Sequence, residues 1–174
     1  MITVSNPQDH IFYNNRGIDY GEKGEYDLAI KDFTKAIELK PDYAIAYNNR
    51  AAVYRSKGKH DLAIEDCDKA IQLNPDYAEP YSNRGAAYRN KGDYERAIRD
   101  YDRAIKLKPN FVQAYYNRGL AYHEKGDFDL ALKDYNKAIE LNPELFHPYN
   151  NRGNAYRQKG DFDRAIEDYT KAIE

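Results

Sequence analysis

Five asparagines recur at intervals of 34 residues, and their amides are the clearest candidate binding groups in this sequence. They are Asn15, Asn49, Asn83, Asn117 and Asn151. Asparagine is a middling helix former, so helix propensity does not explain the column. An amide both donates and accepts hydrogen bonds, and can therefore hold an extended peptide backbone without reading its side chains. The alternative is that these amides tie one helix to its neighbour.

Further residues are expected on the same surface once each unit is numbered from His10, Ala44, Ala78, Val112 and Phe146. Helical spacing places positions 2, 5, 6, 9, 12 and 13 on the face of the unit's first helix that points away from the core. The additional peptide-binding candidates are Asn14, Asn48, Tyr116, Arg55, Arg89, His123 and Arg157. Because these side chains differ in charge and polarity, the expected ligand is an extended, partly apolar segment and not a polyanion.

Two columns are charged in every unit and suggest a structural partnership. Position 7 is arginine in every unit (Arg16, Arg50, Arg84, Arg118, Arg152) and position 23 is aspartate in every unit (Asp32, Asp66, Asp100, Asp134, Asp168). We predict that each arginine reaches an aspartate on a neighbouring helix through charge-assisted hydrogen bonds. The alternative is that both columns are solvated.

The sequence offers no arrangement typical of catalysis or metal binding. His10, His60, His123 and His147 fall at unrelated repeat positions, and there is no phosphate loop and no Cys/His pair at ligand spacing. We therefore predict a protein that is not an enzyme and has no cofactor or metal. The lone Cys67 excludes an internal disulfide, and its position predicts a buried, inert thiol.

Composition narrows the partners. Among 174 residues, 27 Lys and Arg balance 29 Asp and Glu, so no strong field favours nucleic acid or a membrane. No segment approaches the roughly 18 apolar residues of a membrane span, and the first residues lack the pattern of a signal peptide. These features predict a cytoplasmic protein with a protein or peptide partner.

The elements that position these residues are pairs of amphipathic helices. Apolar and small residues at positions 4, 8 and 11, and again at 17, 20, 21, 24 and 27, follow helical spacing. Glycine at position 15 separates the two helices, and proline at position 32 follows the second. Such short pairs must stack on neighbours, which predicts an all-α, right-handed α-solenoid of helix-turn-helix repeats.

The period and its columns resemble the tetratricopeptide repeat family. The matching columns are tyrosine at position 4 (Tyr13, Tyr47, Tyr81, Tyr115, Tyr149) and alanine at position 20 (Ala29, Ala63, Ala97, Ala131, Ala165). The resemblance implies one repeat domain over 1–174, with a flank at 1–9, repeats at 10–43, 44–77, 78–111 and 112–145, and a truncated repeat at 146–174. It also implies that the first helices line a concave groove.

Two resemblances within that family point to different ligands. The asparagine column is similar to that of the superhelical domain of O-linked N-acetylglucosamine transferases, which implies binding of an extended peptide. Co-chaperone repeats need cations at positions 2 and 5, where this chain has residues such as Asn48 and Glu79. A carboxylate clamp of that kind is therefore not expected.

The leading interpretation is a scaffold that binds an extended peptide segment in the groove. The alternative is a structural or designed repeat module that self-associates end to end. Asn6-Pro7 repeats the phase of Asn74-Pro75, so we expect the chain to begin on the tail of a missing unit and to stop inside a second helix. That arrangement predicts a homo-oligomer formed by end-to-end stacking.

Overall fold

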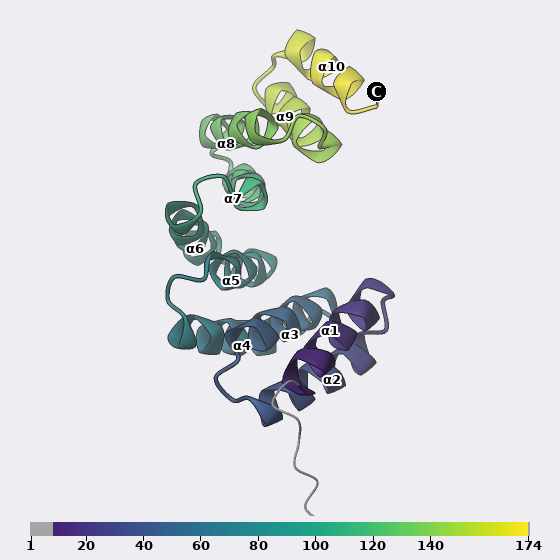
Figure 1. Cartoon of the computed structure of the whole chain (residues 1–174). Coiled ribbons are helices and arrows are strands. Elements are labelled where there is room, and N and C mark those ends of the chain that lie inside the picture. The colour runs from purple at the N-terminus through teal and green to yellow at the C-terminus, as the bar shows by residue number, and fades with distance from the viewer. Residues whose placement is uncertain (1–8, 174) are drawn as a thin grey trace, which may run out of the picture. The chain divides into compact units, whose positions relative to one another are not determined.

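The computed structural model describes residues 9–173, and every regular element in that range is an α-helix (Figure 1). The helices are α1 (Asp9–Glu22), α2 (Tyr26–Leu39), α3 (Ala44–Ser56), α4 (His60–Leu73), α5 (Ala78–Asn90), α6 (Tyr94–Leu107), α7 (Val112–Lys125), α8 (Phe128–Leu141), α9 (Phe146–Gln158) and α10 (Phe162–Lys171). The predicted flank at 1–9, with Asn6 and Pro7, lies outside the described residues except for Asp9, which begins α1.

The helices form five pairs, and a glycine in a left-handed conformation marks the turn within each pair. Its φ is positive in every repeat: 76° at Gly24, 71° at Gly58, 80° at Gly92, 89° at Gly126 and 79° at Gly160. Glycine adopts this conformation without the steric cost of a Cβ atom. The prediction of paired helices in an all-helical fold is therefore confirmed.

The chain divides into two compact units, with the boundary inside α5 between Ala87 and Tyr88. In the first unit α1 packs on α2, α2 on α3, and α3 on α4. In the second unit α6 packs on α7, and the same sequential packing continues through α8 and α9 to α10. Because each helix packs mainly on its neighbours in sequence, every repeat is stabilised by the one beside it.

The predicted arginine–aspartate ladder joins the two helices of a repeat. Arg118 Nε and Nη2 each donate to Asp134, at 2.7 Å, and the pairs Arg16–Asp32, Arg50–Asp66 and Arg152–Asp168 have the same two-pronged geometry. All four aspartates are buried. Burial raises the pKa of Asp134, and the hydrogen bonds and the charge of Arg118 oppose that rise.

The third arm of the arginine reaches back to the preceding repeat. Arg118 Nη1 donates to Asp102 at 2.5 Å, and Arg50 Nη1 donates to Thr34 at 2.9 Å. Arg152 does the same to Asn136. One arginine side chain therefore links three helices. Lysine carries a single ammonium group and could not make all of these hydrogen bonds, which explains why this column is arginine.

Position 8 and position 24 have complementary sizes. Phe33 lies across Gly17, Tyr135 across Gly119, and Tyr169 across Gly153. A Cβ atom added to these glycines would lie 2.7 to 2.8 Å from the nearest ring carbon. In the second repeat the small residue is alanine, and the residue packed in the same core cluster is the buried Cys67. A glycine at position 8 therefore goes with a large aromatic ring at position 24, and the larger Ala51 goes with the smaller thiol of Cys67.

This pairing predicts opposite effects for two glycine substitutions. Gly119→Ala forces a methyl group against the Tyr135 ring, and overpacking of this kind costs about 1 to 3 kcal/mol. Gly21→Ala, also in a helix, meets its nearest atom at 3.7 Å and should be neutral or stabilising by about 0.4 to 1 kcal/mol. Urea denaturation of both variants measures the difference, and a shift of the same sign in both would contradict the packing argument.

Candidate functional site

The position-6 asparagines lie along the first helices, but part of each amide group is already in use. Asn49 Nδ2 donates to Asn14 Oδ1 at 3.0 Å, and Asn83 Nδ2 donates to Asn48 Oδ1 at 2.9 Å. Asn151 Nδ2 donates to the hydroxyl of Tyr116 at 2.9 Å. Three of the five asparagines therefore link consecutive repeats, as in the alternative considered from the sequence. Within residues 9–173, no donor occupies the amide oxygens of Asn49 and Asn83, which remain as acceptors.

Asn14 and Asn48 do not lie on an open surface. Their side chains are buried, at 3% and 6% exposure. Asn48 also donates to the hydroxyl of Tyr77 at 3.3 Å, and Asn14 donates to Asn15 at 3.3 Å. The expectation that position 5 faces the groove is wrong for these two residues, because the next first helix covers that side of the helix.

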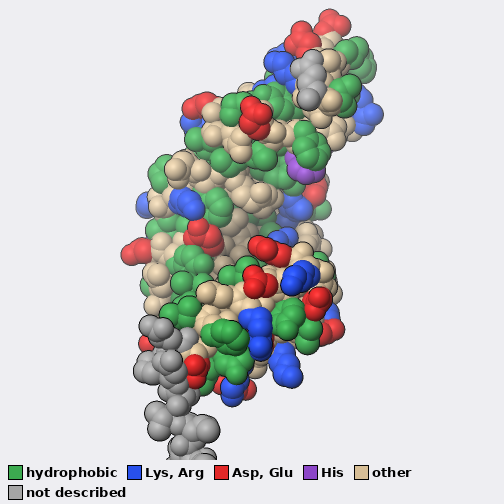
Figure 2. Space-filling model, turned by 45° about the vertical axis from the view of Figure 1, so that its right-hand side comes forward, with side chains coloured by type: hydrophobic (Ala, Val, Ile, Leu, Met, Phe, Trp, Pro, Cys, Tyr) green, Lys and Arg blue, Asp and Glu red, His purple; other side chains and the backbone are tan. Residues whose placement is uncertain are grey.

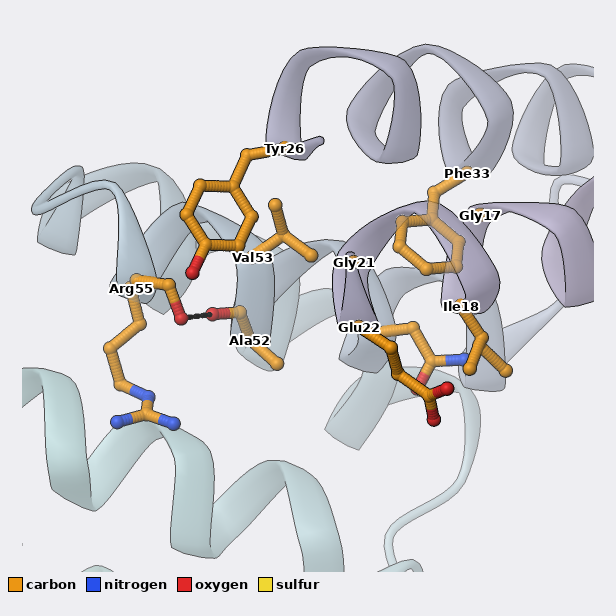
Figure 3. A pocket seen from close by; sticks show the side chains of 11 residues that line it. Gly17, Ile18, Gly21, Glu22, Tyr26, Phe33, Ala52, Val53 and Arg55 are labelled. Atoms are coloured by element: carbon orange, nitrogen blue, oxygen red, sulfur yellow. Dashed lines mark hydrogen bonds between the residues drawn. The ribbon is translucent and has the colours of Figure 1, made fainter. Parts of the chain in front are cut away.

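A hollow of about 290 Å³ opens between α1, α2 and α3 in the first unit (Figure 3). Its lining is largely apolar, with a few polar groups at the edge. The residues are Gly17, Ile18, Gly21, Tyr26, Phe33, Ala52 and Val53, with Glu22, Asn49, Arg55 and Ser56. Figure 3 shows Phe33 above Gly17 and Ile18, while Arg55 extends from α3 on the far side of Val53. This hollow is named the apolar pocket.

The apolar pocket exists because position 12 carries no side chain in the first repeat. That position holds Gly21 on α1, whereas the next three repeats have Arg55, Arg89 and His123. Arg55 closes one end of the pocket, and its Nε atom is buried without a hydrogen-bond partner among residues 9–173. Buried donors are normally paired, so an unpartnered nitrogen beside the pocket is unusual.

The other predicted groove residues fall mainly in the second unit. Tyr116 and His123 lie on α7, and Arg89 lies at the end of α5. Burial raises the pKa of Tyr116 and lowers the pKa of His123, which favours the neutral imidazole. Arg157 is exposed on α9, and Asn117 accepts a hydrogen bond from Gln113 at 3.0 Å.

Sequence reasoning missed the contribution of the second helices to this surface. Phe33 lines the apolar pocket, although its position marked it only as core. Tyr135, at the same repeat position, is fully buried, yet its hydroxyl has no partner among the described residues. The signal was present in the position-8 glycines, because each one lets an aromatic ring from the second helix cross the first.

Three further properties of the described residues concern possible partners: surface charge, possible metal ligands, and helix length relative to a membrane span. On the face in Figure 2, acidic and basic side chains are interspersed over both units. Among residues 9–173, no cluster of three or more His, Cys, Asp or Glu side chains has the arrangement needed to hold a metal ion. None of the described helices has the length and apolar character needed to cross a membrane.

Comparison with protein families matches nearly all of the described chain to tetratricopeptide repeats. A tetratricopeptide repeat model matches residues 11–43, 44–77, 112–145 and 148–174. A second model of that description matches residues 67–99, and a TPR repeat model matches 85–126. The first of these models alone matches more than half of the chain.

Solved structures with the same fold include several repeat proteins. MamA is 30% identical with a TM-score of 0.77, covering 97% of this chain and 92% of its own. YrrB, described as a TPR protein with an unusual peptide-binding site, is 26% identical with a TM-score of 0.69, covering 97% and 87%. A thermophilic TPR protein of Thermus thermophilus is 23% identical with a TM-score of 0.82, covering 94% and 90%.

Proposed function

Since the chain belongs to the tetratricopeptide repeat family, we propose that it is a non-enzymatic scaffold that binds an extended segment of a partner protein along the first helices of its repeats. The observation that carries this proposal is the apolar pocket, which combines an open apolar lining with an unpartnered buried donor on Arg55. Because the similar protein YrrB has a peptide-binding site, a peptide is a natural choice of ligand. The cytoplasm is the expected location.

The apolar pocket suits one large apolar side chain of such a segment. Its volume of about 290 Å³ lies just below the range of small-molecule sites, about 300 to 1,000 Å³. Exposed Ile18 and Ile45 extend apolar surface along α1 and α3. An aliphatic or aromatic anchor would bury its surface against Phe33 and Val53, in the manner of the anchors that dominate interface energetics.

The asparagine column would then hold the main chain of the segment. Asn49 lines the apolar pocket, and its Nδ2 atom is held by Asn14. Its Oδ1 atom accepts no hydrogen bond among the described residues, so it can accept one from a peptide N–H. Linkage between repeats fixes the amide in place before the ligand arrives, which lowers the entropy cost of binding.

The test fills the apolar pocket without disturbing the core. Random ten-residue peptides displayed on phage are selected on the full chain, and enriched peptides are synthesised and titrated. Gly21→Arg places at position 12 the side chain that other repeats carry, and should weaken binding about tenfold or more. Gln72→Arg, an exposed site on α4 with the same charge change, is the control and should bind like the natural chain.

Three outcomes decide the proposal. Selective loss of affinity in Gly21→Arg, with unchanged thermal unfolding, supports it. Equal binding by the natural chain and Gly21→Arg overturns the pocket as the anchor site. Failure to enrich any peptide sequence overturns the binding function itself.

Self-association is the second candidate, and one surface favours it. On α10, Phe162 and Ile166 are each 63% exposed, and Ile173 beyond it is also exposed. The equivalents of Ile166 in the first and fourth repeats, Ile30 and Leu132, pack against core clusters. Sedimentation velocity of the unliganded chain over a range of concentrations distinguishes the two functions, because only end-to-end assembly increases the sedimentation coefficient.

A further inference from the structure

The second unit contains a group of buried polar atoms that the apolar pocket does not explain. Arg89 Nη1, His123 Nδ1 and the Tyr135 hydroxyl are all buried, and none has a hydrogen-bond partner among residues 9–173. The rings of His123 and Tyr135 are 6.4 Å apart. Glu124, next to His123, lies 3.6 Å from Arg89. Folded chains rarely leave several neighbouring buried polar groups unpaired, so this group requires an explanation.

Comparison with the fifth repeat shows what is missing around Tyr135. There the equivalent Tyr169 donates its hydroxyl hydrogen to Asn154 Oδ1 at 2.8 Å. In the fourth repeat the residue at that place is Leu120, which packs against the core cluster that includes Tyr135 and has no polar side-chain atom. Tyr135 itself is fully buried. The fourth repeat therefore keeps the tyrosine but lacks the internal group that would satisfy its hydroxyl.

Arg89 also has unused hydrogen-bonding capacity. Its contact with Glu124 joins Nε to Oε2 at 3.6 Å, which is too long for a hydrogen bond. The Glu124 side chain is substantially exposed, so solvent screens this pair. Burial raises the pKa of both Tyr116 and Tyr135, and the charge of Arg89 opposes that rise in each.

Tyr116 lies at the edge of this group, and its described hydrogen bond does not involve Arg89, His123 or Tyr135. Its hydroxyl accepts a hydrogen bond from Asn151, and its ring stacks on His147 with centroids 6.3 Å apart. The ring of Tyr116 lies 6.2 Å from that of Tyr135. The flat ring of Tyr116 lies beside this group and can support an incoming chain.

We propose that Arg89, Tyr135 and His123 form a carboxylate subsite, which binds the side chain of an aspartate or glutamate in the extended segment. A guanidinium donates to both oxygens of a carboxylate, and a phenol donates one more hydrogen bond. Glu124 opposes the ligand charge and sets the affinity. The inference rests on the proposed peptide-binding function, but it concerns a separate site and separate residues.

The test uses a synthetic library of ten-residue peptides with acetylated N-termini and amidated C-termini, so that only side chains supply carboxylates. The full chain should enrich Asp or Glu at one position. For the best peptide, Arg89→Gln should weaken binding about tenfold, and Tyr135→Phe about threefold to tenfold. Glu124→Gln should strengthen it, because a like charge is removed. Replacing the peptide's acidic residue by its amide should reproduce the loss seen in Arg89→Gln.

A matched tyrosine separates ligand binding from stability. Tyr169→Phe removes a hydroxyl that is already bonded, so it should lower the melting temperature and leave affinity unchanged. Tyr135→Phe should leave the melting temperature unchanged and weaken peptide binding. Enrichment of peptides without an acidic position, or stronger binding of the amide peptide, overturns the subsite and leaves the proposed function standing. Failure to enrich any peptide overturns both.

Discussion

Replacing Asp134 by alanine is expected to lower the free energy of unfolding by about 3 to 5 kcal/mol. The carboxylate is buried and receives two hydrogen bonds from Arg118, at 2.7 Å each. Its removal leaves a largely buried guanidinium whose remaining carboxylate partner among residues 9–173 is Asp102. Urea denaturation followed by circular dichroism measures the loss.

Two further variants identify the cause of that loss. Asp102→Ala removes the exposed partner of the same arginine and should cost about 1 kcal/mol or less. The double variant Arg118→Met with Asp134→Leu removes both charges and should cost less than Asp134→Ala alone, because no charge is stranded. If the losses from the two positions simply add, the buried pair is not coupled and the ladder does not stabilise the fold as we describe.

Phe33→Ala is expected to produce a loss of similar size, about 3 to 5 kcal/mol, through a different mechanism. The ring is 1% exposed and fills the space above Gly17, and it joins the core cluster that includes Ala29 and Val53. Truncation removes buried apolar surface and leaves a cavity beside the apolar pocket. Leu28→Ala on the same helix, at 44% exposure, should have a much smaller effect in the same denaturation experiment.

The location of that loss is a second readout. In repeat proteins each unit is stabilised mainly by its immediate neighbours. Amide hydrogen exchange in Phe33→Ala should therefore accelerate in α1, α2 and α3 more than in α8 and α9. Uniform acceleration over the described chain would show that the repeats unfold as one cooperative block.

Much of the fold could be predicted because it depends on local rules that the sequence repeats five times. Glycines such as Gly24 and Gly126 mark turns by conformation alone, and the φ values agree. The arginine and aspartate columns identified partners because two opposite charges rarely become invariant together without contact. The described pairs confirm that prediction in the first, second, fourth and fifth repeats, as for Arg50 with Asp66.

The candidate site could be predicted only in part, because helical periodicity assigns a residue to a face but does not say what covers that face. Asn14 and Asn48 are on the expected side of their helices and are nevertheless enclosed by the following repeat. The apolar pocket arises from a missing side chain at Gly21, which a search for functional groups overlooks. The unpaired hydroxyl of Tyr135 became visible only through its contrast with Tyr169.

The size match between positions 8 and 24 restricts how these repeats can diverge. Cys67→Phe in the presence of Ala51 would create a collision, whereas Ala51→Gly beside Cys67 would leave only a small void. An evolutionary path from the second repeat to the form of the first therefore proceeds most easily by shrinking one helix before enlarging the other. Recombination that exchanges single helices between repeats would separate these co-adapted partners, so the inheritable module is the hairpin.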